Sequence, residues 1–116
     1  MIDVIITSFK EPKTIGKAIE GFLNQDIKER YNIWVVATDS ETLDVARRYK
    51  GVKIFVDPGK GKSYALHQIL PKLKGEVIVL SDGDVFIKDN TLKYLIEPFE
   101  DKKVGCVTGR PVSAEA

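Results

Sequence analysis

A chain of 116 residues is long enough for one domain with a single hydrophobic core. Hydrophobic residues make up 43% and charged residues 30%, which is typical of a soluble globular protein. The formal net charge of +1 argues against a broad surface for nucleic acid or membrane. The lone Cys106 cannot form an internal disulfide, and the N-terminal stretch MIDVIITSF has no features of a signal peptide or membrane span. We therefore expect a cytoplasmic protein.

Five short apolar runs rich in β-branched residues predict β-strands. They cover residues 2–8, 32–37, 52–56, 76–81 and 104–109. Because these runs are apolar throughout, without alternating polar positions, we expect strands covered on both faces, as in a parallel sheet.

Stretches with helical spacing separate these strands. The first follows Pro12, a residue suited to a first helical turn, and the second is predicted to begin near Ser40, a good N-cap. The third follows Gly61 and should end early at Pro71, and the fourth opens at residues 89–90. The faces expected to be buried consist of Ile15, Ala18, Ile19, Phe22 and Leu23, then Leu43, Ala46 and Tyr49, then Leu66, Ile69, Leu70 and Leu73, then Leu92, Leu95, Ile96 and Phe99.

The alternation of strands and helices predicts an open three-layer α/β/α fold with a mostly parallel, Rossmann-like sheet. In such sheets, ligands bind beyond the carboxyl ends of the strands. Four polar stretches follow predicted strands at this edge: residues 7–11, 37–40, 57–63 and 82–84. Their convergence predicts a functional site there.

Asp82-Gly83-Asp84 ends the most hydrophobic run with two carboxylates separated by a single glycine. Like charges at this separation are costly unless something positive lies between or beside them. One interpretation is a solvated turn, since Asp and Gly are ordinary turn residues. The other is a site for a divalent cation, which removes the repulsion.

Two other motifs at this edge match known signatures only in part. The stretch DPGKGKS has Val56 where a phosphate-binding loop needs its first glycine, although Lys60 and Lys62 ahead of a helix N-terminus could still contact a phosphate. The stretch DGDVF is similar to the Asp-x-Asp signature of haloacid-dehalogenase-type phosphohydrolases. It has Phe86 at the fifth position, however, and follows the fourth strand instead of the first.

Taken together, the polar stretches resemble the family 2 glycosyltransferases, inverting enzymes of the GT-A fold. Phe9-Lys10-Glu11 lies where Tyr-Asn-Glu is common, and Gln25 lies where a glutamine usually ends the first helix. Residues 61–66 match the pattern Gly-Lys-x-x-Ala-Leu, with His67 where asparagine is usual, and residues 82–84 match the metal-binding Asp-x-Asp motif. The resemblance spans nearly the whole chain, and the order and spacing of the motifs make it specific.

This resemblance implies a site for a nucleotide-diphosphate sugar, with a UDP-sugar as the expected donor and Mg²⁺ or Mn²⁺ as cofactor. Asp84 would ligate the metal directly, Asp82 would hold the ribose or a metal-bound water, and Gly83 would let the backbone approach the donor closely. Asp39 resembles the carboxylate that recognises the base. The expected donor-binding residues are Thr7, Phe9, Glu11, Asp39, Lys62 and Asp82, and the expected metal ligands are Asp84 and Asp82.

Simpler roles stay open for several of these residues. Asp39 or Ser40 could cap the second helix, and Glu11 could favour the N-terminus of the first. Lys62 could be a solvated lysine. Arg110, after the last predicted strand, is a further candidate for contact with the donor.

Family members are usually much longer, and their second half supplies the acceptor site and the catalytic base. We therefore expect residues 1–116 to form a single nucleotide-sugar-binding domain that lacks the base and is truncated before the acceptor half. The acceptor is unknown, an exposed sheet edge could support a homodimer, and the remainder of the enzyme could associate with a membrane. The alternatives are a non-catalytic nucleotide- or protein-binding module, a metal-dependent phosphohydrolase and a nucleotidyltransferase.

Overall fold

The computed structural model describes residues 1–100, apart from the side chains of Lys62 and Glu100. The predicted strand at residues 104–109 and Arg110 lie outside the described residues. Strands and helices alternate in the order β1 (Ile2–Thr7), α1 (Ile15–Leu23), β2 (Tyr31–Ala37), α2 (Ser40–Arg47), β3 (Lys53–Val56), α3 (Lys62–Ile69), β4 (Val77–Asp82) and α4 (Thr91–Ile96), with short 3-10 helices at Leu70–Lys72 and Glu97–Glu100.

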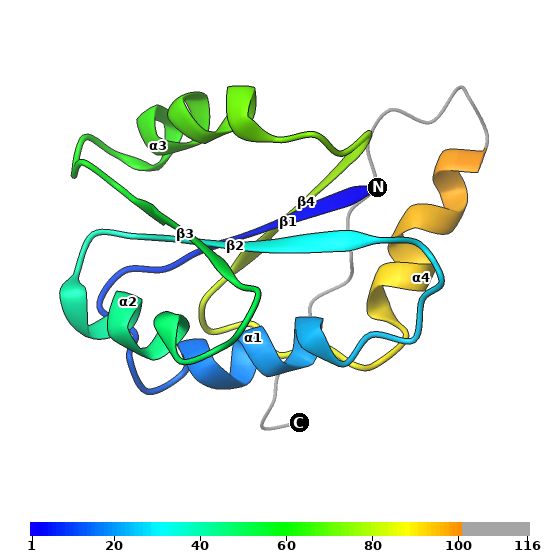
Figure 1. Ribbon diagram of the computed structural model, residues 1–116, viewed down its shortest axis with the longest axis horizontal. Coiled ribbons are helices and arrows are strands. Elements are labelled where there is room, and N and C mark those ends of the chain that lie inside the picture. The colour runs from blue at the N-terminus through cyan, green and yellow to red at the C-terminus, as the bar shows by residue number, and fades with distance from the viewer. Residues whose placement is uncertain (101–116) are drawn as a thin grey trace.

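The four described strands form one parallel sheet in the order β3-β2-β1-β4. Helices α1, α2 and α4 lie on one face of this sheet and α3 lies on the other (Figure 1). The predicted three-layer α/β/α fold is therefore confirmed. Thr7 pairs with Val36 on one side and with Asp82 on the other, so the carboxyl ends of β1, β2 and β4 meet at one edge.

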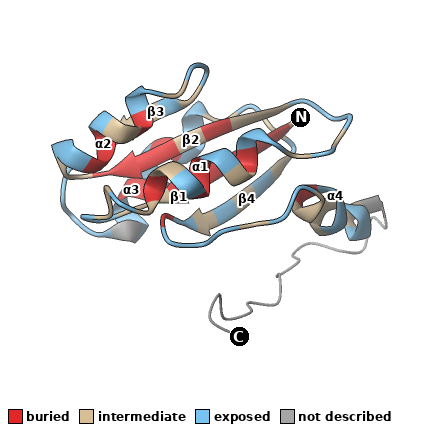
Figure 2. Ribbon diagram, turned by 90° about the horizontal axis from the view of Figure 1, so that it is seen from below, coloured by how far each residue is buried: buried red, intermediate tan, exposed pale blue. Residues whose placement is uncertain are grey.

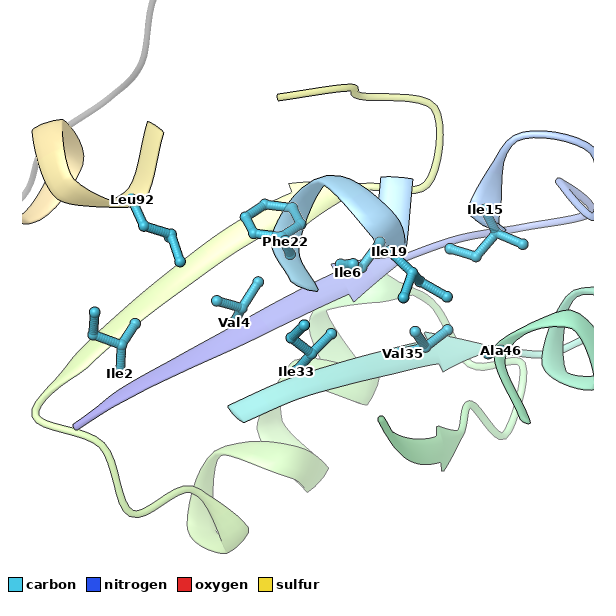
Figure 3. Packing of buried hydrophobic residues seen from close by; sticks show 10 residues of the cluster. All are labelled: Ile2, Val4, Ile6, Ile15, Ile19, Phe22, Ile33, Val35, Ala46 and Leu92. Atoms are coloured by element: carbon cyan, nitrogen blue, oxygen red, sulfur yellow. The ribbon is translucent and has the colours of Figure 1, made fainter. Parts of the chain in front are cut away.

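The larger hydrophobic core lies between the sheet and the layer of α1, α2 and α4. Figure 2 shows that buried residues concentrate in β1, β2 and the inner face of α1. Burying each Ile, Val or Phe side chain of this cluster stabilises the fold by roughly 1.5–3 kcal/mol. The cluster, shown in Figure 3, consists of Ile2, Val4, Ile6, Ile15, Ile19, Phe22, Ile33, Val35, Ala46 and Leu92.

A smaller cluster beneath α3 joins Ile5, Val36, Ala65 and Ile69. As predicted, the helix ends early, because the chain passes into the 3-10 helix that contains Pro71. The prediction of a buried side chain is wrong for Leu23 at the end of α1, which is 39% exposed, and for Leu70, which is 43% exposed. The 3-10 turn changes the angular spacing of side chains and directs Leu70 to solvent.

The expectation that the strands are covered on both faces holds for β1, whose residues from Ile2 to Ile6 are all buried, but it is wrong for β4. Ile78 is 42% exposed and Leu80 is 58% exposed. These side chains lie on the α3 face, because Leu80 is the register partner of Ile5. Within residues 1–100, α3 packs on β1 and β2 and leaves this part of β4 uncovered.

Two helix starts differ from the predictions. Helix α1 begins at Ile15 instead of at Pro12, because the chain first makes a turn at residues 12–14. Helix α2 is capped by Asp39, whose side chain accepts from the backbone N–H of Thr42, and not by Ser40. The alternative interpretation of Asp39 as an N-cap is thus confirmed. In the part of the chain that the structure describes, no helix is long and apolar enough to cross a membrane.

Asp3 is a buried carboxylate at the opposite end of the sheet from the polar edge. Its Oδ1 accepts from Trp34 Nε1 at 3.3 Å and Asn32 Nδ2 at 3.4 Å, and its Oδ2 accepts from the N–H groups of Lys74 at 3.0 Å and Gly75 at 2.6 Å. Burial by itself would raise the pKa of Asp3, but these hydrogen bonds outweigh it and hold the pKa below its usual range. The carboxylate thereby ties the start of β1 to the chain that enters β4.

Replacing Asp3 by alanine should lower the free energy of unfolding by about 1–3 kcal/mol, because four partly buried N–H groups lose their acceptor. The stabilisation by Asp3 is fully present above its unfolded pKa of about 3.9 and is lost as the pH falls through the lower folded pKa. Urea unfolding at neutral and at acidic pH measures both effects, with Asp44→Asn, at an exposed carboxylate paired with Arg47, as the control. An unchanged acid dependence in Asp3→Ala would contradict this account.

Candidate functional site

A groove of about 550 Å³ lies at the edge where the strands end. Its size falls within the range of small-molecule sites. Loops that follow all four described strands contribute to it, so the convergence of polar stretches predicted from the sequence is confirmed. Its polar and aromatic lining includes Thr7, Phe9, Glu11, Asp57, Asp82 and Asp84.

The structure brings together most, but not all, of the predicted donor-binding residues. Thr7, Phe9, Glu11, Asp82 and Asp84 all line the groove. Asp39 lines a separate hollow that shares Glu11 with the groove. The side chain of Lys62 lies outside what the structure describes, although Gly61 just before it lines the groove.

Asp57 lines the groove but was not singled out as a site residue by the sequence analysis. It follows β3 directly, and its Oδ1 accepts from the N–H of Gly59 at 2.8 Å. This turn needs glycine, because Gly59 has a φ of 81° and Gly61 a φ of 102°. The signal in the sequence was its position, since a carboxylate directly after a parallel strand lies at the ligand-binding edge.

Lys60, for which phosphate contact was considered, places its Nζ 5.2 Å from the centre of the Tyr64 ring.

The Asp82-Gly83-Asp84 turn is fastened to the end of β1. Gly83 N donates to Thr7 O at 2.9 Å, and Val85 N donates to Asp82 O at 3.1 Å to close the turn. Thr7 Oγ1 donates to Asp82 Oδ1 at 3.2 Å. Thr7 therefore orients one of the two carboxylates, and both aspartates are exposed.

Gly83 is buried because Ser8 occupies the space that a side chain would need. A Cβ added to Gly83 would lie 2.7 Å from Ser8 Cβ, closer than real Cβ contacts allow, and 3.2 Å from Glu11 Oε1. Ser8 Oγ in turn donates to this Glu11 oxygen at 3.1 Å. The glycine between the two aspartates thus has a packing reason inside the protein, whether or not it also lets a donor approach.

Glu11 and Phe9 belong to the loop between β1 and α1. The Glu11 carboxylate accepts from Ser8 Oγ and, at 3.4 Å, from Phe9 N, so it closes its own loop and does not lie in the first turn of α1. The side chain of Phe9 is 63% exposed at the groove. An exposed aromatic ring beside carboxylates is suited to contact with a ring-containing ligand.

Asp39 is held by hydrogen bonds from two directions. Its Oδ1 accepts from Lys10 N at 2.9 Å, and its Oδ2 accepts from Thr42 N at 3.1 Å and Thr42 Oγ1 at 2.5 Å. Burial would raise the pKa of Asp39, but these hydrogen bonds keep the pKa below its usual value. Thr42 was not among the residues predicted for the site, although side chains three positions after an N-cap commonly interact with the cap.

The segment that follows Asp84 is fixed to the end of α1 by Gln25. Its Nε2 donates to Gly21 O at 2.8 Å and Lys88 O at 2.6 Å, and its Oε1 accepts from Leu92 N at 2.8 Å. The glutamine thereby satisfies an N–H group in the first turn of α4. The residue noted in the sequence only as part of a resemblance has a clear structural role.

The carboxylate oxygens of Asp82 and Asp84 suit a hard divalent cation whose remaining coordination positions are filled by a bound ligand. Within residues 1–100, no group of three or more His, Cys, Asp or Glu side chains is placed to hold a metal ion. Mg²⁺ commonly binds through only one or two carboxylates together with phosphate oxygens and water. The pair is therefore suited to a cation that arrives with a phosphate-bearing ligand.

A family model described as Glycosyl transferase family 2 matches residues 3–116. The chain belongs to glycosyl transferase family 2. The predicted family is thereby confirmed, and the parallel sheet with flanking helices is its GT-A fold.

Curated relatives and a solved structure agree with this assignment. The chain is 26% identical to the beta-monoglucosyldiacylglycerol synthase of Trichormus variabilis, over 99% of this chain and 27% of that protein. It is 28% identical, over 85% of this chain and 34% of the other, to a dolichyl N-acetyl-alpha-D-glucosaminyl phosphate diacetamidodideoxyglucuronosyltransferase of Methanococcus voltae. The crystal structure of S. aureus TarS superimposes with a TM-score of 0.68 at 25% identity, over 97% of this chain and 23% of that chain. The chain thus spans about a quarter to a third of these proteins.

Replacing Gly83 by alanine should lower the free energy of unfolding by about 1–3 kcal/mol, because the new methyl group overlaps Ser8. The cost is a matter of contact, since the φ of Gly83 is not positive. The double variant Gly83→Ala with Ser8→Gly should recover most of the loss, and a double-mutant cycle by urea unfolding measures the coupling. Strictly additive losses would show that Ser8 is not the residue in the way.

Proposed function

We propose that this chain forms the donor-binding part of a glycosyltransferase and binds a nucleotide-diphosphate sugar, with UDP as the nucleotide. The observation that carries the proposal is the Asp82–Asp84 carboxylate pair in the lining of a groove to which Phe9 and Asp57 also contribute. Membership of glycosyl transferase family 2 supports it.

The strand order supports an extended ligand along the groove. Asp57 follows β3 and Asp82 ends β4, and these are the outer strands of the described sheet. With neighbouring strands about 4.8 Å apart, the two ends of the groove are separated by about 14 Å. We place the diphosphate near Asp82 and Asp84 and the nucleoside toward Phe9 and Asp57.

Different residues of the groove are proposed to contact the metal ion and the nucleoside. Asp84 and Asp82 are proposed to hold Mg²⁺ or Mn²⁺, and Thr7 keeps the Asp82 carboxylate oriented through its hydroxyl hydrogen bond. When bound, the cation would act as a Lewis acid toward the leaving diphosphate. Phe9 would offer its ring to the nucleoside. Base recognition by Asp39 and phosphate contact by Lys62 stay predictions.

The proposal for the acceptor rests on the relatives. One curated relative is named for a glucosyldiacylglycerol and another for a dolichyl phosphate sugar. We propose an acceptor that is a lipid or carries one, at a membrane-associated part of the full-length enzyme. The described residues are assigned only to the donor, and the catalytic base is not assigned to any of them.

Calorimetric titration of UDP into the chain tests the donor site. We expect binding in Mn²⁺ that disappears in EDTA, and at least a roughly tenfold loss of affinity in Asp84→Asn, because the cation loses a charged ligand. Asp44→Asn, on the exposed surface of α2, should bind like the wild type. CDP and GDP titrations report base preference.

Two results would contradict the proposal. UDP could bind equally well in Mn²⁺ and EDTA, which would make Asp82-Gly83-Asp84 only a turn. A folded chain could also fail to bind any of the three nucleotides in the presence of metal, which would favour a non-catalytic module.

A further inference from the structure

We infer that Thr42 is a positioning residue of the donor site, whose buried hydroxyl holds the loop after β1 in its groove-forming conformation. This loop, residues 8–11, is called the Phe9 loop below. The inference rests on the proposed function, because it names a residue that acts on donor binding without touching the donor. Thr42 itself lies in α2 and does not line the groove.

The Thr42 hydroxyl makes hydrogen bonds in two directions from a fully buried position. Its side chain is 0% exposed, its Oγ1 accepts from Glu11 N at 3.1 Å, and the same oxygen donates to Asp39 Oδ2 at 2.5 Å. A hydroxyl group can donate and accept at once, whereas an isosteric methyl group can do neither. Thr42 therefore links the Phe9 loop to the carboxylate that caps α2, in addition to the hydrogen bond from Lys10 N to Asp39 Oδ1.

The backbone conformation of Lys10, which this link helps to hold, is an unfavourable one. Lys10 has a φ of 51° and is the one residue other than glycine in the described part of the chain with a positive φ. A side chain with a Cβ adopts this left-handed conformation only when surrounding contacts determine it. The contact is Lys10 N to Asp39 Oδ1, at 2.9 Å, and Asp39 is itself held by Thr42.

The held loop shapes the groove at two points. Phe9 lies between Ser8 and Lys10 and places its exposed ring at the groove. Glu11, fixed through its N–H by Thr42, turns its carboxylate back to Ser8, and Ser8 fills the space over Gly83 in the predicted metal-binding turn. Loss of the Thr42 hydroxyl should therefore disturb both the position of the Phe9 ring and the packing of Ser8 against the Asp82-Gly83-Asp84 turn.

The side chain of Thr42 can be tested separately from the capping of α2. The cap is the hydrogen bond of 3.1 Å that the Thr42 backbone N–H donates to Asp39 Oδ2. A valine at position 42 keeps that N–H and the shape of the side chain. Thr42→Val thus removes the link to the Phe9 loop and leaves the cap. Thr42→Ser retains the hydroxyl, and Val45→Ala removes apolar contacts from the same helix without touching the link.

The experiment measures the affinity for UDP in Mn²⁺ by calorimetry and the exchange rates of the Lys10 and Glu11 amide protons by NMR. We expect Thr42→Val to weaken UDP binding by roughly tenfold and to speed exchange at both amides, because a buried hydrogen-bonded link is lost. Thr42→Ser should keep affinity and protection near wild type. Val45→Ala should lower the melting temperature without changing either readout.

The outcomes separate this inference from the proposed function. If the wild type binds UDP and Thr42→Val binds it equally well with protected amides, the positioning role is wrong and the donor site stands. If the wild type does not bind UDP, the proposed function fails, and unchanged exchange at Lys10 and Glu11 would still overturn the structural link. If Thr42→Val does not fold, Asp39→Asn replaces it with amide exchange at Lys10 and Glu11 as the readout, because asparagine caps a helix but has only one acceptor oxygen for the Thr42 and Lys10 donors. Unchanged exchange at both amides in Asp39→Asn would overturn the link.

Discussion

The parallel pairing of β1 with a neighbour on each side is the constraint on which the rest of the structure depends. It places Thr7 beside Val36 and Asp82, so that residues far apart in the sequence end their strands together. The pairing continues past the end of the strand, where Ser8 N donates to Val36 O at 2.9 Å and Gly83 N donates to Thr7 O at 2.9 Å. The turn that carries the two aspartates is therefore a continuation of the sheet, and the buried residues of β1 support it.

Around this turn, hydrogen bonds attach the loops of the groove to the ends of helices. Asp39 and Thr42 hold the Phe9 loop at the start of α2, and Gln25 holds the segment after Asp84 at the end of α1. Ser8 packs against Gly83 where the two walls meet. A groove whose walls are fixed by internal hydrogen bonds is preorganised, so less free energy is lost to ordering when a ligand binds.

The sequence predicted the layers, the positions of the four described strands and the family, because these depend on local patterns or on the order of motifs. Its errors arose where the neighbours in space decide the outcome. The apolar run at β4 looked like a strand buried on both faces, yet α3 does not reach Leu80 in the described residues. Ser40 is a good capping residue by type, but Asp39 is the residue whose side chain accepts from Thr42 N. Propensity alone cannot choose between adjacent capping residues.

The site shows the same division. Position after a strand was enough to place Asp82, Asp84 and Glu11 at the groove, and it placed the stretch 57–63 there too, although Asp57 was not named as a site residue. It also suggested Asp39, which lies instead in the neighbouring hollow. Thr42 could not be found in this way, because a threonine inside a predicted helix carries no signal that its hydroxyl reaches a loop 31 positions away.

The most direct test of the central claim, that the edge where β1 and β4 end binds a metal and a nucleotide together, is a two-dimensional NMR titration of the labelled chain with Mn²⁺ and UDP. Paramagnetic Mn²⁺ broadens the amide signals of nearby residues. The account predicts selective broadening of Thr7, Gly83 and Asp84 that strengthens with UDP and is lost in Asp84→Asn. Broadening centred elsewhere on the chain, or broadening of these signals that Asp84→Asn leaves unchanged, would contradict it.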